Sequence, residues 1–311
     1  MTGKVPMSTQ WSSWFGTVAV LAGGSAGVLL WFSGCASISD GMQLAAGSVT
    51  SLPVDLPLVQ DAARATQAGA KLVYHESGPL QEYQLGRGVT ASLLGAYQPV
   101  VAQTPVSQYV NRVGAVVAAG SNAPNPYDGY RFIVVETAEI NAFAAPGGFI
   151  VVTTGMLRFL RSEDELAVIL GHEVGHVELQ HAIRDVGREN LTTFLDASKD
   201  LALEQQDPQA VQLLNQLTGE MTGKIRQGYS VEFEAAADRR AMAICGRAGY
   251  DGAALPVILE RFKAKTGTYG GANYPQQRSD LARQFLRTLG GEAAPASPAR
   301  TARYQRAIAG L

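Results

Sequence analysis

The stretch His172-Glu173-Val174-Gly175-His176 has the pattern H-E-x-x-H and lies within a run of residues whose apolar spacing predicts a helix. An α-helix turns by about 100° per residue, so histidines four positions apart project from one face, one turn from each other. This arrangement allows two imidazoles to bind a single Zn²⁺, while the glutamate between them reaches a water molecule at the metal. The stretch therefore predicts a zinc hydrolase and, within that class, favours a peptidase.

A third ligand is expected in the stretch Glu234-Ala235-Ala236-Ala237-Asp238. Its two acids are four positions apart on one face of a predicted helix, and the alanines leave room for close packing against the first helix. Glu234 would complete a His₂Glu set with one open position, which is the arrangement of catalytic zinc. Asp238 is suited to accept the outer N–H of a ligand histidine. The alternative is that these acids face solvent, and Glu232 is the competing carboxylate nearby.

The remaining histidines and one of the two cysteines fit other roles. His181 follows His176 by five positions, so it points about 140° away on a continuous helix and would be a ligand only if the helix ended first. We interpret it as a polar partner or a surface residue, and His75 as a structural residue. Cys245 lies in an alanine-rich helical run and is expected to be a buried, small apolar residue.

The spacing of apolar residues predicts an α+β fold that is mainly helical. A strand is expected at 131–136, and a hairpin at 141–144 and 148–153 turns through Ala145-Pro146-Gly147. A capping-box pattern at Ser162-Glu163-Asp164-Glu165 opens the helix of the histidine motif. We expect the edge strand of the small sheet to flank this zinc helix. Further helices are expected at about 61–120, 229–247, 253–265 and 278–289, and two more in 186–228, separated at Pro208.

The predicted domain organisation has four parts. Residues 1–34 have the features of a lipoprotein-type signal peptide, because the uncharged segment 14–32 precedes Ser33-Gly34-Cys35, which resembles a lipobox with Cys35 as the lipidated residue. An uncleaved transmembrane anchor is the alternative. The tether is 35–60, and the metallopeptidase domain is 61–290. Within the metallopeptidase domain, 186–228 is a helical insertion and a possible lid. The fourth part, 291–311, is a low-complexity linker and C-terminal tail.

Composition and the N-terminal segment set the expected location. The chain is 46% hydrophobic and 17% charged, with a net charge of −2, so a basic nucleic-acid-binding surface is not expected. Either interpretation of the N-terminal segment attaches the remainder to a bacterial membrane outside the cytoplasm. We expect a periplasmic protein on a lipid anchor, and the absence of Asp at the second place after Cys35 favours the outer membrane.

Several separated motifs resemble those of one family. They are Asn141 to Gly148 (N-A-F-A-x-P-G-G), Gly155-Met156-Leu157, the block from Glu165 to His181, Glu234 to Asp238 (E-x-x-x-D), and Gly249-Tyr250-Asp251. Together they are similar to the HtpX and CAAX-prenyl-protease family of gluzincin zinc metallopeptidases. The likeness covers about 80–290 and is strongest to its small periplasmic lipoprotein branch, which performs envelope quality control.

The resemblance implies a gluzincin fold with one Zn²⁺ per chain, and protein substrates that are unfolded or misfolded. Glu173 would be the general base. Asn141 would hold substrate backbone, as in the family. An extended peptide would also pair with the strand at Gly148, Phe149 and Ile150 if that strand is a sheet edge.

The sequence departs from the family after the third-ligand helix. Family members carry a His-Pro pair there, but this chain has Tyr274-Pro275 with Arg278 beyond. A tyrosine hydroxyl could donate to a developing oxyanion, or Tyr274 could be a surface aromatic. Two other functions stay open: a chaperone or assembly factor with structural zinc, and a self-inhibited peptidase with 186–228 or the C-terminal tail in its cleft.

Overall fold

The computed structural model describes residues 78–100, 102–186, 208–266, 278–289 and 297–311. All of these lie in one compact unit that spans Pro57–Leu311. The predictions for the signal peptide, the tether, Cys35, His75 and Tyr274 fall outside the described residues. Among the helices within them, none is both long enough and apolar enough to traverse a lipid bilayer.

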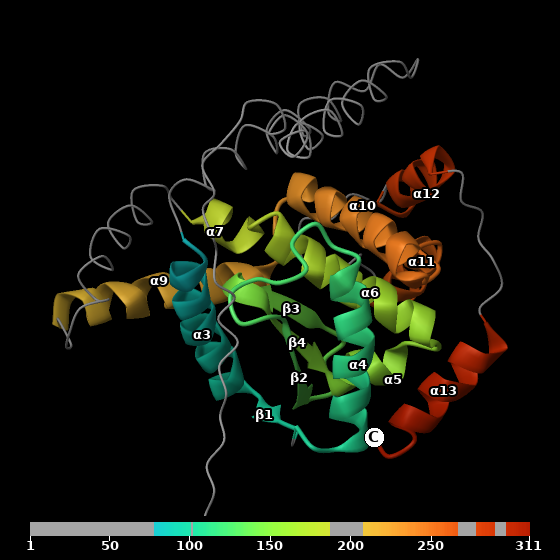
Figure 1. The fold of residues 1–311 in the computed structure, drawn as a ribbon, viewed down its shortest axis with the longest axis horizontal. Coiled ribbons are helices and arrows are strands. Elements are labelled where there is room, and N and C mark those ends of the chain that lie inside the picture. Colours follow the sequence, from blue (N-terminus) through green and yellow to red (C-terminus); the bar gives the residue numbers. More distant parts are fainter. Residues whose placement is uncertain (1–77, 101, 187–207, 267–277, 290–296) are drawn as a thin grey trace, which may run out of the picture. The chain divides into compact units, whose positions relative to one another are not determined.

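A four-stranded mixed sheet lies at the centre of this unit (Figure 1). Its order is β1-β2-β4-β3, with β2 parallel to β4 and β3 antiparallel to β4. The strands are β1 (Gln98–Pro99), β2 (Arg131–Glu136), β3 (Ala142–Ala145) and β4 (Phe149–Thr153). The α+β class, the strand at 131–136 and the hairpin are therefore confirmed.

The hairpin between β3 and β4 turns through a short 3₁₀ segment, η1 (Pro146–Gly148). Gly147 and Gly148 have φ angles of 69° and 92°, which side-chain-bearing residues rarely adopt. A Cβ on Gly147 would also lie 2.6 Å from the Cα of Tyr83. Both backbone shape and space therefore require glycine at this turn.

The strand after Gly148 is not a sheet edge, so the condition for substrate pairing at this strand is not met. β4 pairs with β2 on one side and with β3 on the other, so its backbone has no free edge. All five of its residues are buried, which explains its unbroken apolar sequence. The edge strand that flanks the helix of the histidine motif is β3.

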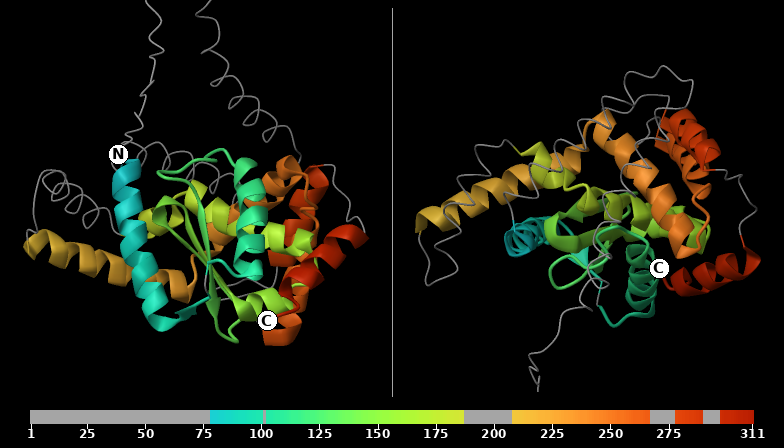
Figure 2. Two further views of the ribbon diagram at one scale, coloured as in Figure 1. Left: turned by 60° about the horizontal axis from the view of Figure 1, so that its bottom comes forward. Right: turned by 45° about the horizontal axis from the view of Figure 1, so that its top comes forward.

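Helices cover both faces of the sheet (Figures 1 and 2). Side chains on one face of β4, Ile150 and Val152, join a cluster with α4 (Pro105–Ala119) and α6 (Glu163–Glu178). Val151, on the other face, joins a cluster with α3 (Pro79–Ala96) and α9 (Pro208–Gln227). The remaining helices are α5 (Thr154–Phe159), α7 (His181–Asp185), α10 (Val231–Ala248), α11 (Ala254–Thr266), α12 (Arg278–Thr288) and α13 (Pro298–Ile308).

The helix of the histidine motif, α6, packs closely on α10. Added Cβ atoms at Gly171 and Gly175 would lie 3.3 Å and 3.0 Å from atoms of α10, so both glycines allow the close approach. Serine side chains cap both helices, Ser162 at the start of α6 and Ser230 at the start of α10. Cys245 is fully buried in the core, as expected.

The C-terminal segment is not a separate tail. Residues from Pro298 form α13, and Tyr304 on this helix is fully buried, with its hydroxyl donating to the carbonyl of Leu157 at 2.5 Å. The sequence predicted a tail after a low-complexity linker, and Arg300 and Arg303 lie in this segment. In the structure those arginines meet buried carboxylates of α6, so 298–311 is part of the domain.

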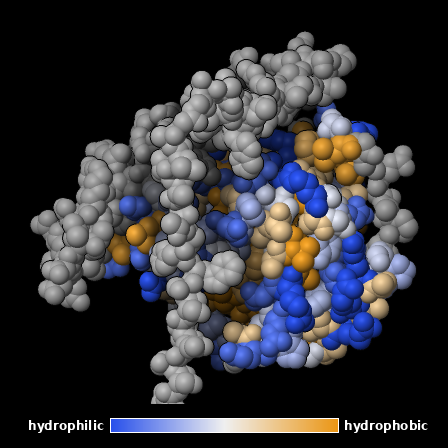
Figure 3. Space-filling model, in the orientation of Figure 1, coloured by the Kyte–Doolittle hydropathy of each residue, from blue (hydrophilic) through white to orange (hydrophobic). Residues whose placement is uncertain are grey.

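The face shown in Figure 3 carries mostly hydrophilic side chains around α4 and α13, with apolar residues in small groups between them. This distribution is usual for helices that face water. Within the predicted insertion 186–228, α9 begins at Pro208, where the sequence predicted a helix boundary. Residues 187–207, and with them part of the possible lid, lie outside the described residues.

Candidate metal centre

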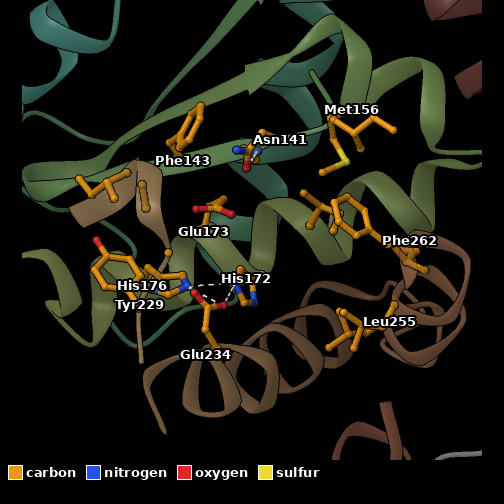
Figure 4. Close-up of a pocket in the computed structure, with 18 of the residues that line it drawn as sticks. Asn141, Phe143, Met156, His172, Glu173, His176, Tyr229, Glu234, Leu255 and Phe262 are labelled. Carbon is orange, nitrogen blue, oxygen red and sulfur yellow. Dashed lines mark hydrogen bonds and ion pairs between the residues drawn. The ribbon is translucent and has the colours of Figure 1, made fainter. Parts of the chain in front are cut away.

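The three candidate ligands converge between α6 and α10 (Figure 4). Nε2 of His172 lies 2.9 Å from Nε2 of His176 and 3.1 Å from Oε2 of Glu234. Nε2 of His176 is 3.6 Å from the same carboxylate oxygen. All three side chains are buried, and they form the one cluster among the described residues whose geometry could hold a metal ion.

These distances fit a single tetrahedral metal ion. With metal–ligand bonds of about 2.0–2.1 Å, two ligand atoms in a tetrahedral site lie about 3.3 Å apart, close to the separations observed here. Oε2 of Glu234 is buried and has no hydrogen-bond partner in the described part of the chain, although Nη2 of Arg278 lies 3.5 Å from it. A cation between the three atoms would satisfy it.

The electrostatics of the cluster also favour a cation. Burial alone would lower the pKa of His172, but contacts with Asp238 and Glu234 outweigh burial and raise that pKa to about 10. Burial alone would raise the pKa of Glu234, but His176 and His172 hold it well below its usual value. The cluster therefore stabilises positive charge, and a metal ion would compete with protons for it.

A buried ion pair lies next to the outer ring nitrogen of His172. Nδ1 of His172 lies 2.9 Å from Oδ1 of Asp238, one turn along α10 from Glu234. Arg278, at the start of α12, donates to both oxygens of Asp238, at 2.5 and 2.7 Å. This places Asp238 where the sequence predicted a partner for the outer nitrogen of a ligand histidine.

Aromatic rings, and not an ion pair, surround the outer nitrogen of His176. Nδ1 of His176 is 2.8 Å from Nδ1 of His181, and the ring of Tyr229 stacks on His176 with centroids 4.7 Å apart. Phe233 stacks on His181, with centroids 4.3 Å apart and an angle of 4° between the planes.

The interpretation of His181 as a surface residue is wrong, and the polar-partner alternative fits. α6 ends at Glu178, and Gln180 adopts a left-handed conformation with a φ of 54°. The chain turns at this residue, and α7 brings His181 next to His176, where it is fully buried. The helix does end before His181, but this histidine lies behind His176 and not among the three ligand atoms.

The candidate base faces a cavity of about 300 Å³ beside the ligands. In Figure 4, Glu173 lies between the two histidines and Asn141, on the side opposite Glu234. Burial raises the pKa of Glu173, and the neighbouring histidines oppose this shift. The cavity therefore brings the candidate base next to the ligands in a space that a substrate can enter.

One end of this cavity is apolar. Beyond His172, away from Tyr229, side chains from α5, α6 and α11 and from the residue before Asn141 form its wall (Figure 4). We call this set the apolar wall. Its members are Ile140, Met156, Ile169, Leu255, Leu259 and Phe262.

The four predicted substrate-binding residues separate into two groups. Asn141 lines the cavity together with β3 residues Ala142 to Ala144. Gly148, Phe149 and Ile150 do not line it, because β4 is enclosed between β2 and β3 and its side chains enter the core. Tyr274 lies outside the described residues, so its prediction stands unchanged.

Sequence reasoning missed Tyr229 and the apolar wall. Tyr229 lies just before the cap of α10, and an isolated tyrosine at such a place carries no local signal of a metal site. The residues of the apolar wall come from segments spread over more than a hundred positions and share no local pattern. No signal in the sequence would have assembled them.

Comparison with known proteins found a matching family model and several similar proteins. The family model described as "Peptidase family M48" matches residues 106–302. The "Beta-barrel assembly-enhancing protease" of Escherichia coli K12 is 31% identical over 188 residues, which are 58% of this chain and 37% of that protein. The "Putative beta-barrel assembly-enhancing protease" of Vibrio cholerae is 30% identical over 170 residues, 53% of this chain and 34% of its own length.

A third relative comes from a eukaryote. The "Mitochondrial metalloendopeptidase OMA1" of Arabidopsis thaliana is 32% identical over 143 residues, covering 46% of this chain and 27% of that protein. The chain thus spans about a third of the length of the relatives it matches.

Proposed function

The chain belongs to peptidase family M48, the family that its motifs predicted, and from this membership we propose that it is a zinc-dependent endopeptidase acting on unfolded or misfolded proteins of the bacterial envelope. The observation that carries the proposal is the convergence of His172, His176 and Glu234 beside a cavity that also holds Glu173. A structural metal site has no use for a buried carboxylate facing such a cavity, so this arrangement favours catalysis over a purely structural role.

The described residues have distinct roles in this proposal. A zinc ion held by His172, His176 and Glu234 would polarise the peptide carbonyl and make water a stronger nucleophile. Glu173 would take the proton of the attacking water and deliver it to the leaving amine. Asp238 would accept the Nδ1–H of His172 and keep Nε2 of that ring directed at the metal.

The edge strand suggests how substrate is bound. β3 pairs on one side only among the described strands and lines the cavity, so its other side is available to an extended peptide. Asn141, at the start of this strand, would contribute polar contacts to the substrate backbone. Because main-chain pairing tolerates many sequences, this mode suits unfolded proteins.

The direction of β3 predicts which part of the substrate meets the apolar wall. Antiparallel pairing is the more stable arrangement, and it would run the peptide from the Ala145 end of β3 toward the Asn141 end. In Figure 4, Asn141 lies toward the apolar wall, while Phe143 lies toward Tyr229. Side chains after the scissile bond would then reach the apolar wall, which favours large apolar residues there. Such residues are accessible mainly in unfolded chains.

The cellular setting stays part of the proposal. Two of the relatives are named as β-barrel assembly-enhancing proteases, and that name suggests a comparable role in the envelope for this chain. We propose lipidation at Cys35 and attachment to the periplasmic side of a bacterial membrane, with the outer membrane favoured. No nucleic-acid partner is proposed.

A single substitution tests the proposal. Glu173→Gln in the full-length chain should lower cleavage of casein by about 10²–10⁴-fold, because it removes the proton acceptor, while the bound zinc stays equal to that of the wild type. The matched control is Glu232→Gln, since Glu232 is exposed on α10 and outside the cavity. It should cleave casein at the wild-type rate.

Two other results would favour the alternatives. Equal cleavage by Glu173→Gln and wild type would contradict the proposed mechanism. Wild-type protein that binds zinc, holds casein and never cleaves it would favour a chaperone. Activity that appears only after limited proteolysis of the full-length chain would favour a self-inhibited peptidase.

A further inference from the structure

We propose that His181 is a positioning residue of the metal centre, whose Nδ1 accepts the Nδ1–H of His176 and so keeps Nε2 of His176 directed at the metal. The two nitrogens are 2.8 Å apart, within hydrogen-bond distance. The inference rests on the proposed function only in requiring that the three ligands bind a metal ion. It assigns a role to a residue that is not itself a ligand.

The proton positions follow from the geometry. Nε2 of His176 faces Nε2 of His172 and the carboxylate of Glu234, so Nε2 is its metal-binding atom. A neutral imidazole bound to metal through Nε2 carries its proton on Nδ1, and that proton needs an acceptor. The nearby Nδ1 of His181 is the acceptor, so the proton of His181 is on its own Nε2.

The surroundings of His181 hold its ring in place. Its side chain is fully buried, with one ring face stacked on Phe233. The guanidinium of Arg184 lies over the ring of Phe233, 5.0 Å from its centroid.

The turn at Gln180, after α6, sets the position of the His181 ring. Gln180 adopts its left-handed conformation, and its side chain donates to Glu82 on α3. This contact ties the turn to a different part of the fold. His181 therefore approaches His176 from a fixed direction.

Packing alone does not explain a histidine at this position. Nε2 of His181 is buried and has no hydrogen-bond partner in the described part of the chain. An unpaired buried donor destabilises the folded state, so an apolar side chain of similar size would pack there at lower cost. The contribution of this histidine therefore lies in its Nδ1.

The proposal predicts opposite effects on two measurements of one variant. In the full-length chain, His181→Leu should weaken zinc binding by about 10–100-fold in a chelator competition, as expected for loss of a partner behind a ligand. The metal-free protein should unfold at the same temperature as the wild type or higher, because the unpaired donor is removed. His181→Gln keeps a side-chain acceptor and should bind zinc more tightly than His181→Leu.

Each alternative result is decisive. Wild-type zinc affinity in His181→Leu would overturn the proposal. So would a lower unfolding temperature of the metal-free variant, or failure of that variant to fold, because both would show a packing role. If the wild type binds no zinc, the proposed function fails, and with it the premise of this inference.

The tautomers supply an independent readout. In ¹⁵N NMR spectra of the zinc-loaded protein, His176 should carry its proton on Nδ1 and His181 on Nε2. A proton on Nδ1 of His181 would contradict the proposed hydrogen bond.

Discussion

Both ends of α6 lie among buried charged side chains, but only at the N-terminal end does every acid accept hydrogen bonds from an arginine. At the N-terminal turn, each of three consecutive acids pairs with an arginine from another helix. At the other end, Oε2 of Glu234 faces nitrogens of two histidines and lies 3.5 Å from Nη2 of Arg278, but it makes no hydrogen bond within the described residues. The first end therefore anchors the helix through direct ion pairs, while the second leaves a buried carboxylate oxygen that a cation would satisfy.

The anchored end combines several favourable interactions. Glu163 binds Arg303 and Tyr109, and the arginine pairs of Asp164 and Glu165 come from α13 and α11. Negative charge is also stabilised at a helix N-terminus by the helix dipole. Because α13 supplies two of the arginines, the C-terminal segment contributes to the orientation of the metal-binding helix. Substitutions at the two ends should therefore have separable effects.

The largest effect is expected at the ligand end, from Asp238→Ala. The substitution leaves Arg278 buried without its main carboxylate partner and removes the acceptor behind His172. The metal-free protein should lose about 3–5 kcal/mol of unfolding free energy in urea. Zinc affinity should fall by about 10–100-fold in chelator competition. An unchanged zinc affinity would remove Asp238 from the metal centre.

The second effect concerns the anchored end alone. Tyr304→Ala removes a fully buried aromatic side chain of α13 and should lower the unfolding free energy by about 3–5 kcal/mol. Below the unfolding transition, zinc affinity should equal that of the wild type. Tyr304→Phe is the matched control, because it loses only the hydrogen bond to Leu157 and should cost about 1 kcal/mol. A large loss of zinc affinity in Tyr304→Ala would show that the two ends are not separable.

The smallest effect is expected from Arg303→Gln, and it concerns how the free energy of unfolding depends on pH. Burial alone would raise the pKa of Glu163, but hydrogen bonds from Arg303 and Tyr109 outweigh it and lower the pKa in the folded state. The lowered pKa stabilises the protein above about pH 4.3, the ordinary glutamate value, and this stability is lost as pH falls through the folded pKa. In Arg303→Gln, the free energy of unfolding measured in urea should fall less between pH 7 and pH 4 than it does in the wild type.

The size of this last effect is limited by solvent. The Arg303 side chain is 50% exposed, so the pair should contribute less than about 1 kcal/mol at pH 7. A steeper loss of stability at low pH in Arg303→Gln than in the wild type would contradict the assigned role of the arginine.

Much of the candidate site follows from local sequence rules. The histidine pair and the acid pair of α10 each lie four positions apart on one helix, so helical geometry alone places each pair on one face. The caps at Ser162 and Ser230 and the glycine turn at Gly147 are likewise properties of short segments. These elements were predictable because the interactions that form them span only a few residues.

The differences between prediction and structure concern contacts between distant segments. The position of His181 depends on a turn at Gln180. The side chain of Gln180 contacts α3, about a hundred positions earlier in the chain. The edge of the sheet is β3 because β2 pairs with the far side of β4, which no local pattern of β4 reveals. The apolar wall is assembled from several elements in the same way.

The sequence by itself determined the class of the fold, the two metal-binding helices and their candidate ligands, because backbone periodicity dictates which side chains share a face. The tertiary structure decided what stands behind each ligand and which strand is open to substrate. It also decided that the C-terminal helix belongs to the domain, since Arg300 and Arg303 meet carboxylates 136 and 140 positions earlier in the chain. Charge and hydrophobicity can be read from residues one by one, but neutralisation of a buried charge requires two groups to meet in space, and only the folded chain brings them together.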